Sequence, residues 1–595
     1  MKRIILLFTT ALILFGCEDY LTRDPLDTIT DTPAFWNNEN NIRTVAVGLY
    51  DQYFEGWRSG WSRTDWYAET NVADWTDDNA QRVATYFTKV TPSTDGTNWS
   101  FTNLRRVNIL IDRVGKTTAL SEEAKNHWQG VGRLFRALEY YKLVSRFGDV
   151  PWYDAPLESN DPDGLYQPRQ PRAQVMDKVA EDLDFAAKNI RISDGVKGLT
   201  VTRDVALAYT SRVMLFEGTW QKYNENNSEA ARRYLTIAKD AAATLMQSNR
   251  YSLAPDYKSL TTSISLAGNP EMILYREYET SVLTHSLMSF QNTEAEGSSP
   301  SRSLIESYLS TNGLPITQPE NSLFRGDDWF FDEIADRDPR LHAIIDTDGL
   351  RLEGVHTIYA ASGYFTNRFV NESLIDDPGG KSSTNITDAP VMKLNEVLMN
   401  YIEAAAELAD LGAYTLVQSD FDNSINRIRD RPSTSMPHLT LAGNQLMVGG
   451  VTLNDPSRDA DVSPILWEIR RERRTELVYE GIRFNDLRRW GKLEYADMAI
   501  NSKLNLGAWI DKERYVTWYN ETYAPSTPLT LSSLDPIKLD RAGNAGYLKP
   551  ISDASLLRVH AAKDYLYPIP LDQIALYKTK GVTLAQNPGW ETVSN

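Results

Sequence analysis

The stretch PILWEIRRERRTELVYEGIRFNDLRRWG, from Pro464 to Gly491, decides how this chain folds. It predicts a helix with Ser463 as its N-cap and Pro464 at its first position, because both residue types are favoured at those places. At 100° per residue, Ile465 and Ile469 share one face, as an amphipathic helix requires.

Charged residues lie on that same face. Arg473, Glu476 and Glu480 fall on the arc that Ile469 and Leu477 define. An unpaired buried charge costs several kcal/mol or more, so we expect these side chains to be paired. We predict an i,i+3 ion pair between Arg473 and Glu476, and a partner for Glu480 elsewhere in the fold.

We expect Gly481 to end this helix, and Phe484, Leu487 and Trp490 to form a second short amphipathic turn. Carboxylates beside arginines are able to perform acid–base chemistry, or they form a structural ion-pair network that fixes helix register. We favour the structural interpretation, because the stretch contains nothing that resembles a nucleophile or a set of metal ligands.

Five stretches carry a family resemblance. RRERRTELVYEGIRFNDLRRWG resembles the signature of the SusD/RagB family, the outer-membrane glycan-binding lipoproteins of Bacteroidetes-type bacteria. Four others also resemble SusD/RagB stretches and stand in the expected order: RLFRALEYYKLVSRFGDVP, LNEVLMNYIEAAAELADLG, INRIRDR and YLYPIPLDQIALYKTKGVTLAQNPGW.

The resemblance covers most of the chain and implies a mainly α fold. That fold is a TPR-like, SusD-like scaffold of four helix pairs, with a loop-rich, partly β insert that forms the ligand-binding face. It also implies a partner, a SusC-like TonB-dependent outer-membrane transporter that the protein caps like a lid.

Composition narrows the class of protein. The chain has 595 residues, of which 42% are hydrophobic and 11% aromatic, so it is able to bury a large core. Its formal net charge is −18 and it has no basic tract, which argues against a nucleic-acid partner.

The N-terminus is typical of a bacterial lipoprotein. Residues 1–16 predict a signal peptide, because a charged start precedes an apolar run too short to span a bilayer. Cys17 is the only cysteine and directly follows that run, so we predict that it carries the lipid anchor. Residues 17–36 would then form a tether, and the acidic Glu18 and Asp19 resemble a surface-export signal. We expect a surface-exposed protein anchored in the outer membrane.

Helical periodicity and its interruptions divide the remaining chain, residues 37–595. We predict a helical scaffold over about 37–269 and 391–595, and a loop-rich insert over about 270–390. Within the insert, Glu271–Tyr278 and Gly354–Phe369 read as β-rich pieces. The segments that predict helices begin near residues 37, 99, 121, 171, 202, 228, 395 and 419.

Two polar regions supply the candidate binding residues, because aromatic side chains on polar loops often mark recognition surfaces. We predict Trp99, beside the first region, to be a core residue. The candidate glycan-binding residues are Trp57, Trp61, Trp66, Asp74 and Trp75 from the first region, and His285, Phe290, Arg302, Trp329 and Tyr364 from the insert.

Acidic residues stand beside one of these tryptophans. Asp74, Asp77 and Asp78 flank Trp75 and would suit a glycosidase pair, a calcium site, sugar hydroxyls or a solvated loop. We favour the solvated loop for Asp77 and Asp78.

The sequence therefore predicts a binding protein. It has no P-loop, GxSxG or HExxH motif, and we expect no catalysis, no metal and no cofactor. The predicted function is capture of an oligo- or polysaccharide and its delivery to the transporter. Two alternatives stay open: a peptide-binding lid of the RagB kind, and a glycoside hydrolase with a helical toroid.

Overall fold

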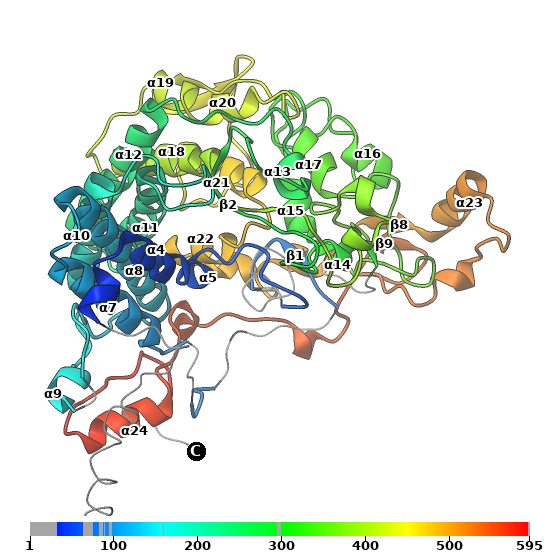
Figure 1. The fold of residues 1–595 in the computed structure, drawn as a ribbon. Coiled ribbons are helices and arrows are strands. Elements are labelled where there is room, and N and C mark those ends of the chain that lie inside the picture. Colours follow the sequence, from blue (N-terminus) through cyan, green and yellow to red (C-terminus); the bar gives the residue numbers. More distant parts are fainter. Residues whose placement is uncertain are drawn as a thin grey trace, which may run out of the picture.

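Long helices lie side by side in one half of the molecule, and shorter elements joined by loops form the other half (Figure 1). The computed structural model describes residues 32–62, 75–82, 87, 90–94, 98–158, 160–293 and 299–592. Within these ranges the strands are short and pair into antiparallel sheets of two or three. The mainly α fold class predicted from the sequence is confirmed.

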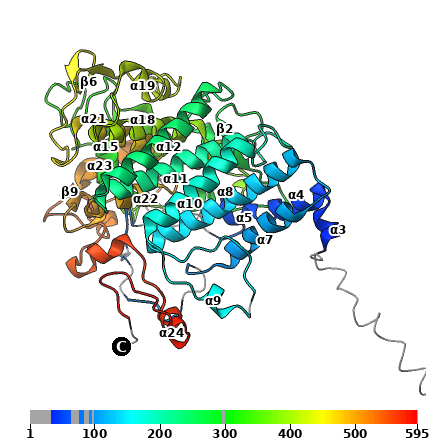
Figure 2. The ribbon, with the colours of Figure 1, turned by 90° about the vertical axis from the view of Figure 1, so that its left-hand side faces the viewer.

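The long helices follow one another as neighbours (Figure 2). Their contacts run from α7 to α8, then to α10, α11, α12, α18 and α21, which is the stacking expected of helix-pair repeats. None of the helices in the described ranges is both long enough and apolar enough to cross a membrane. The bounds are α4 Glu39–Val47, α7 Thr102–Lys116, α8 Glu122–Phe147, α10 Arg172–Asn189, α11 Arg203–Tyr223, α12 Ser228–Gln247, α18 Leu394–Asp410 and α21 Pro464–Glu476.

Local sequence signals set the ends of these helices. The Ser121 hydroxyl accepts a hydrogen bond from the Ala124 amide at 3.2 Å and caps α8, as its residue type predicts. Gly148 ends the same helix with a φ of +72°, a conformation that glycine adopts without strain. α12 begins at Ser228, where the sequence predicts a helix start, and Asn227 is its N-cap.

Small residues let the scaffold helices approach closely. Ala206, Ala208 and Ala404 are fully buried, as expected from their positions on the facing sides of helices. At Gly218 of α11, an added Cβ would stand 2.6 Å from Leu235 of α12, so only glycine fits there. One large apolar cluster fills the helical half, and Trp99 belongs to it as predicted; a second fills the loop-rich half.

The stretch that decides the fold forms two helices. Ser463 caps α21 as predicted, its hydroxyl accepting from the Leu466 amide at 3.3 Å. The helix ends at Glu476, so the prediction that Gly481 ends it is wrong. The turn that follows uses two left-handed residues, Tyr479 at φ +61° and Gly481 at φ +73°. The predicted second amphipathic turn is confirmed as α22, Arg483–Arg489.

Two paired strands bracket the loop-rich insert. β2, Met272–Arg276, pairs antiparallel with β4, Ala389–Lys393, so the chain enters and leaves this region at adjacent points. The strand predicted within Glu271–Tyr278 is confirmed. The structure describes all of residues 354–369 and has no strand there, only isolated bridge positions at Ala360 and Thr366, so the second β-rich prediction is wrong.

The helix predicted from residue 419 onward is also wrong as a single element, because Ser424 interrupts it and two short helices form, α19 and α20. The remaining helices are α3 Pro33–Trp36, α5 Tyr50–Tyr53, α9 Pro162–Leu165, α13 Ser259–Thr262, α14 Ser289–Asn292, α15 Arg302–Ser307, α16 Phe330–Ile334, α17 Pro339–Ile344, α19 Gln418–Asp422, α20 Ile425–Arg429, α23 Lys512–Tyr523 and α24 Leu571–Thr579. The remaining strands are β1 Asn79–Ala80, β3 Ser299–Pro300, β5 Thr440–Ala442, β6 Gln445–Val448, β7 Val451–Thr452, β8 Trp509–Asp511 and β9 Ala545–Tyr547.

Candidate functional site

The predicted tryptophan surface separates into buried and exposed residues. Trp57 is 1% exposed and donates a hydrogen bond from Nε1 to the Thr387 carbonyl at 3.1 Å. Trp75 is 7% exposed and packs against Phe484, with the ring centroids 5.5 Å apart. Neither ring presents a face at the surface of this structure, and their role in glycan binding stays a prediction. The positions of Trp66, Asp74 and Cys17 fall outside the described residues.

Trp61 keeps the position predicted for a recognition residue. It is 50% exposed, and its ring meets that of Phe290 edge-on at 6.0 Å. Phe290 itself is 7% exposed, so it supports the tryptophan rather than presenting its own face. This pair joins the first polar region to the insert and exposes the ring of Trp61.

Three other predicted residues of the insert are buried in the interior of the protein. His285 is buried and makes contact with the Thr387 carbonyl through Nε2 at 3.0 Å, and burial lowers its pKa to about 3. Tyr364 is buried and donates from its hydroxyl to Glu333 at 2.8 Å. Arg302 is buried and pairs with Glu306 at 2.7 Å. These three contacts fold the loops onto one another, and the role of these residues in ligand binding stays a prediction.

The charged face of α21 forms a buried network, but its partners differ from the prediction. Arg473 pairs with Asp486 of α22 at 2.8 Å and donates to Asn400 of α18 at 2.8 Å. Glu476 is not its partner and instead binds two arginines, Arg431 at 2.8 Å and Arg340 at 3.0 Å. The predicted pair between Arg473 and Glu476 is therefore wrong, because long-range partners satisfy both charges.

Glu480 has the distant partners that the sequence analysis expected. It pairs with Lys393 at the end of β4 and with Arg368 of the insert, the latter at 3.5 Å.

Asp77 and Asp78 also form buried ion pairs. Asp77 pairs with Arg483 at 2.7 Å, and Asp78 pairs with Arg474 at 2.8 Å. The solvated loop predicted for these two aspartates is wrong, since both are at most 3% exposed.

A cluster of aromatic rings that the sequence analysis did not single out lies on α23. Asp511 caps this helix by accepting from the amides of Glu513 and Arg514 at 3.0 and 3.1 Å. The helix protrudes from the loop-rich half, at the right of Figure 1. Helical spacing places the rings of Tyr515, Trp518, Tyr519 and Tyr523 along one side.

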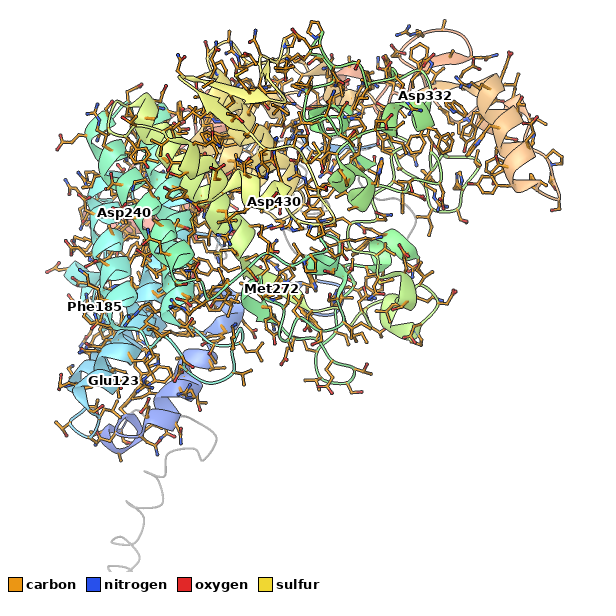
Figure 3. All side chains as sticks on the ribbon, turned by 90° about the horizontal axis from the view of Figure 1, so that it is seen from above. Glu123, Phe185, Asp240, Met272, Asp332 and Asp430 are labelled. Carbon is orange, nitrogen blue, oxygen red and sulfur yellow. The ribbon has the colours of Figure 1, made fainter. Side chains whose placement is uncertain are left out.

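Trp329, a predicted recognition residue, joins this cluster. Its ring meets Trp518 edge-on at 6.0 Å, and the guanidinium of Arg514 lies 4.1 Å from its centroid. Trp329 immediately precedes α16, whose Asp332 lies at the far end of the molecule from Glu123 of α8 (Figure 3). The neighbouring Phe331 also packs on Trp518, at 5.2 Å.

A polar rim completes a cavity of about 200 Å³, which we call the aromatic pocket. Arg351 is held by Asp346 at 2.6 Å, and the Tyr523 hydroxyl donates to the Asp348 carbonyl at 3.2 Å. His356 meets Tyr519 edge-on at 5.9 Å. The residues of the aromatic pocket are Asp346, Asp348, Gly349, Leu350, Arg351, His356, Tyr515, Trp518, Tyr519 and Tyr523.

Two features fix the shape and charge of the aromatic pocket. Gly349 has a φ of +149°, and an added Cβ would stand 2.7 Å from Trp518, so the indole rests directly on the backbone. Burial, helped by the positive charge of Arg351, lowers the pKa of His356 to about 4. Its Nδ1 accepts from the Leu352 amide at 3.0 Å, so the ring is neutral near pH 7.

The aromatic pocket is suited to binding rather than to metal chemistry. Aromatic faces pack on apolar ligand surfaces, while Arg351, Asp346 and Asp348 offer hydrogen-bonding groups at the rim. Across the described part of the chain, no group of three or more His, Cys, Asp or Glu side chains is arranged to hold a metal ion. The sequence signal that was missed is the spacing of aromatics at 515, 518, 519 and 523.

Related proteins match this chain in sequence. SusD-like protein P2 of Formosa agariphila is 22% identical over 77% of this chain and 80% of its own length. SusD-like protein P25 of the same organism is 26% identical over 29% of this chain. That match spans only about a third of P25, at 34% of its length.

Solved structures share the fold over nearly the whole chain. A SusD-like carbohydrate binding protein from Bacteroides fragilis superposes with a TM-score of 0.64 at 19% identity, covering 91% of this chain and 98% of its own. A laminarin binding SusD-like protein has a TM-score of 0.53 at 18% identity, covering 93% and 100%. At these identities the likeness establishes the fold alone.

Two family descriptions match the sequence directly. Residues 19–215 match a family described as starch-binding and associating with the outer membrane. Residues 270–590, more than half of the chain, match the SusD family. The chain therefore belongs to the SusD family.

Proposed function

We propose that this protein is a lipid-anchored glycan-binding protein of the outer-membrane surface. It captures an oligo- or polysaccharide and delivers it to a SusC-like TonB-dependent transporter, without catalysis. Membership of the SusD family supports this proposal, as does the fold shared with a SusD-like carbohydrate binding protein and a laminarin binding SusD-like protein. The observation that carries it is the aromatic pocket, which Trp518 lines together with three tyrosines.

The chemistry of a sugar suits this pocket. The C–H groups on one face of a pyranose carry slight positive charge and pack against the negative face of an aromatic ring. Trp518 and Tyr519 would supply that face, and Tyr523 at the exposed end of the helix would extend it. Arg351 and Asp348 would then direct the hydroxyls, since they lie at the rim of the same cavity.

The test combines a glycan array with calorimetry on the mature protein. A polysaccharide that the array selects should bind Trp518→Ala about 2 kcal/mol more weakly, the loss typical of a hot-spot residue. Trp61→Ala is the matched control, because it removes another exposed tryptophan on a different surface. Normal binding by Trp518→Ala and weakened binding by Trp61→Ala would place the site at Trp61. Selection of peptides in place of glycans would overturn the proposal.

The anchor and the lack of turnover have separate tests. Cys17→Ala should release folded protein into the soluble fraction; protein that stays on the membrane after carbonate washing would exclude Cys17 as the anchor. Prolonged incubation with the bound oligosaccharide should leave its length unchanged by mass spectrometry. Shortening that persists after repurification would favour the hydrolase alternative.

A further inference from the structure

A second cavity, of about 300 Å³, lies along α21 and shares no residue with the aromatic pocket. We call it the central cavity. Trp467, Arg470, Arg471 and Arg474 line it, and their spacing of three and four residues places them along one face of the helix. Residues 303–307, 455–459 and 495–503 contribute the facing wall.

Carboxylates neutralise most of the cations in this wall. Arg474 pairs with Asp78 at 2.8 Å, Arg483 with Asp77 at 2.7 Å, and Lys503 with Glu306. Arg471 also has its own partners, Asp455 and, at 3.0 Å, Glu468. These side chains are held by one another and leave little charge for a ligand.

Arg470 is the exception. Its Nη2 donates to Glu407 at 3.0 Å, but that carboxylate also binds Lys222 at 2.6 Å and the Tyr223 hydroxyl at 2.8 Å. Lys222 also pairs with Asp410 at 2.6 Å, so Glu407 and Asp410 together balance the charges of Arg470 and Lys222. Arg470 is exceptional in its hydrogen bonding, because Nη2 alone among its nitrogens has an acceptor within the described residues.

Arg470 also has hydrogen-bonding capacity to spare. The residue is 5% exposed, and among the described residues its Nε and Nη1 find no hydrogen-bond acceptor. The guanidinium lies 4.4 Å from the ring centroid of Trp490, which fixes its position. Buried donors without a partner are rare in proteins because they are costly, so these nitrogens mark a place that an acceptor from a ligand would fill.

The rest of the wall indicates what else the ligand contains. The half-buried rings of Trp467 and Tyr495 line the cavity beside polar Ser457 and Asn501. Asp459 accepts from the Tyr495 hydroxyl at 2.5 Å and lines the cavity as well. Aromatic faces beside hydroxyl, amide and carboxylate groups suit a ligand that has both C–H faces and hydroxyls.

We propose that the central cavity binds a uronic acid, as a monosaccharide or as the end of a short acidic oligosaccharide. Its carboxylate accepts from Nε or Nη1 of Arg470, because a guanidinium and a carboxylate form charge-assisted hydrogen bonds. Its ring lies against Trp467 or Tyr495. A volume of about 300 Å³ is at the small end of ligand pockets, which restricts the ligand to one or two sugar units.

Ligand-observed NMR and calorimetry on the mature protein test this site, with sodium glucuronate and galacturonate as probes. Glucose, acetate and sulfate are the matched competitors. A uronate should bind at least about tenfold more tightly than glucose, which lacks the carboxylate, and than acetate or sulfate, which lack the sugar. Equal binding of glucose would overturn the role of Arg470, and equal binding of acetate or sulfate would overturn the sugar assignment.

Variants locate the binding. Arg470→Gln should weaken uronate binding about tenfold. Because Arg470 is buried and this variant is at risk of misfolding, Tyr495→Ala and Trp467→Ala at half-buried positions provide the second measure, and each should weaken binding severalfold. Leu576→Ala, a change at an exposed residue of α24, is the control that should leave it unchanged, and Trp518→Ala tests the aromatic pocket. Uronate binding that survives both the Tyr495 and the Trp467 changes would overturn the proposal, while loss of binding only in Trp518→Ala would assign the uronate to the aromatic pocket.

Discussion

Helices α21 and α23 reverse the usual relation between polarity and burial. α21, PILWEIRRERRTE, is rich in charge, yet eight of its residues are buried: Leu466, Glu468, Ile469, Arg470, Glu472, Arg473, Thr475 and Glu476. α23, KERYVTWYNETY, carries four aromatic rings, yet Tyr515 is its one buried residue. Burial in this protein follows the partners a side chain finds in the fold, and the composition of the helix alone does not reveal them.

The difference follows from what surrounds each helix. Glu472 of α21 lies between Arg340 at 2.7 Å and Arg429 at 2.7 Å, two arginines from distant parts of the chain. The rings of α23 pack mainly on one another and on Trp329 and Phe331, at the edge of the molecule. The first helix holds the two halves of the protein together, and the second presents a surface.

Removing a charge from the buried ion-pair network around α21 should have the largest effect on the free energy of unfolding. Arg431→Ala should lower the free energy of unfolding by about 3–5 kcal/mol, because it strands the buried carboxylates of Glu271 and Glu476. Urea unfolding followed by circular dichroism measures this loss. Arg325→Ala is the control, since its pair with Asp336 is exposed and should contribute about 1 kcal/mol or less. Equal losses of unfolding free energy in the two variants would show that the buried network contributes no more to stability than an exposed ion pair does.

Acid should also weaken the ion-pair network of α21, with the second-largest effect on the free energy of unfolding. Burial alone would raise the pKa of Glu472, but Arg340 and Arg429 lower it from 4.5 to about 2. A carboxyl whose folded pKa is depressed contributes its full stability above about pH 4.5, and that contribution is lost as pH falls toward 2. Between pH 5 and pH 3 the wild type should lose about 2 kcal/mol from this group.

Urea unfolding at the two pH values measures the loss, and Glu472→Gln serves as the comparison because it removes the titrating group. A variant with the same pH dependence as the wild type would show that Glu472 does not carry this loss.

Affinity for glycan at the aromatic pocket should stay constant between pH 6 and pH 8, because the pKa of His356 lies far below that range.

Tyr523→Ala should affect binding but not folding. The ring is 49% exposed at the end of α23, so its removal should change the free energy of unfolding by about 0.5 kcal/mol or less. It should weaken glycan binding about tenfold, or about 1.4 kcal/mol, if the ring contacts the sugar. Leu576→Ala, a change at another exposed apolar residue on α24, should alter neither quantity. Calorimetry and thermal melts on both variants decide, and unchanged affinity in Tyr523→Ala would remove this ring from the site.

The smallest effect concerns Arg514. Its guanidinium lies 4.1 Å from the centroid of Trp329, and an exposed contact of this kind stabilises by about 0.5–1 kcal/mol. Arg514→Ala should lower the free energy of unfolding by that amount, as measured by urea unfolding. Arg514→Lys keeps the charge and should retain part of the effect. A loss as large as that of Arg431→Ala would show that α23 is tied to the core as firmly as α21 is.

The scaffold was predictable from the sequence because its signals are local. Apolar residues at helical spacing and the caps Ser121 and Ser463 placed helices to within a few residues. The presence of buried charge on α21 was also predictable, since Arg473 shares a face with Ile469. Its partners were not, because Asn400 and Asp486 are brought to it only by the tertiary fold.

The candidate site was predicted less well. In loops, no periodicity separates a buried ring from an exposed one, so Trp57 and Trp61 looked alike although one is in the core and the other faces solvent. Trp329 was found by residue type and does join the cluster beside the aromatic pocket. The rings on α23 had a readable spacing, but the polar composition around Trp518 hid the helix from a search for apolar stripes.

The pairing of β2 with β4 makes the region between them resemble an exchangeable cassette. Because entry and exit are adjacent, a segment of different length is able to leave and rejoin the scaffold there without moving the helices. Two arginines of that segment nevertheless reach into the scaffold, Arg340 to Glu472 and Glu476, and Arg368 to Glu480. A transplanted segment would have to bring both arginines with it. Exchange of this cassette would replace the residues that it contributes to the aromatic pocket, among them Asp346, Arg351 and His356, provided that both arginines are retained.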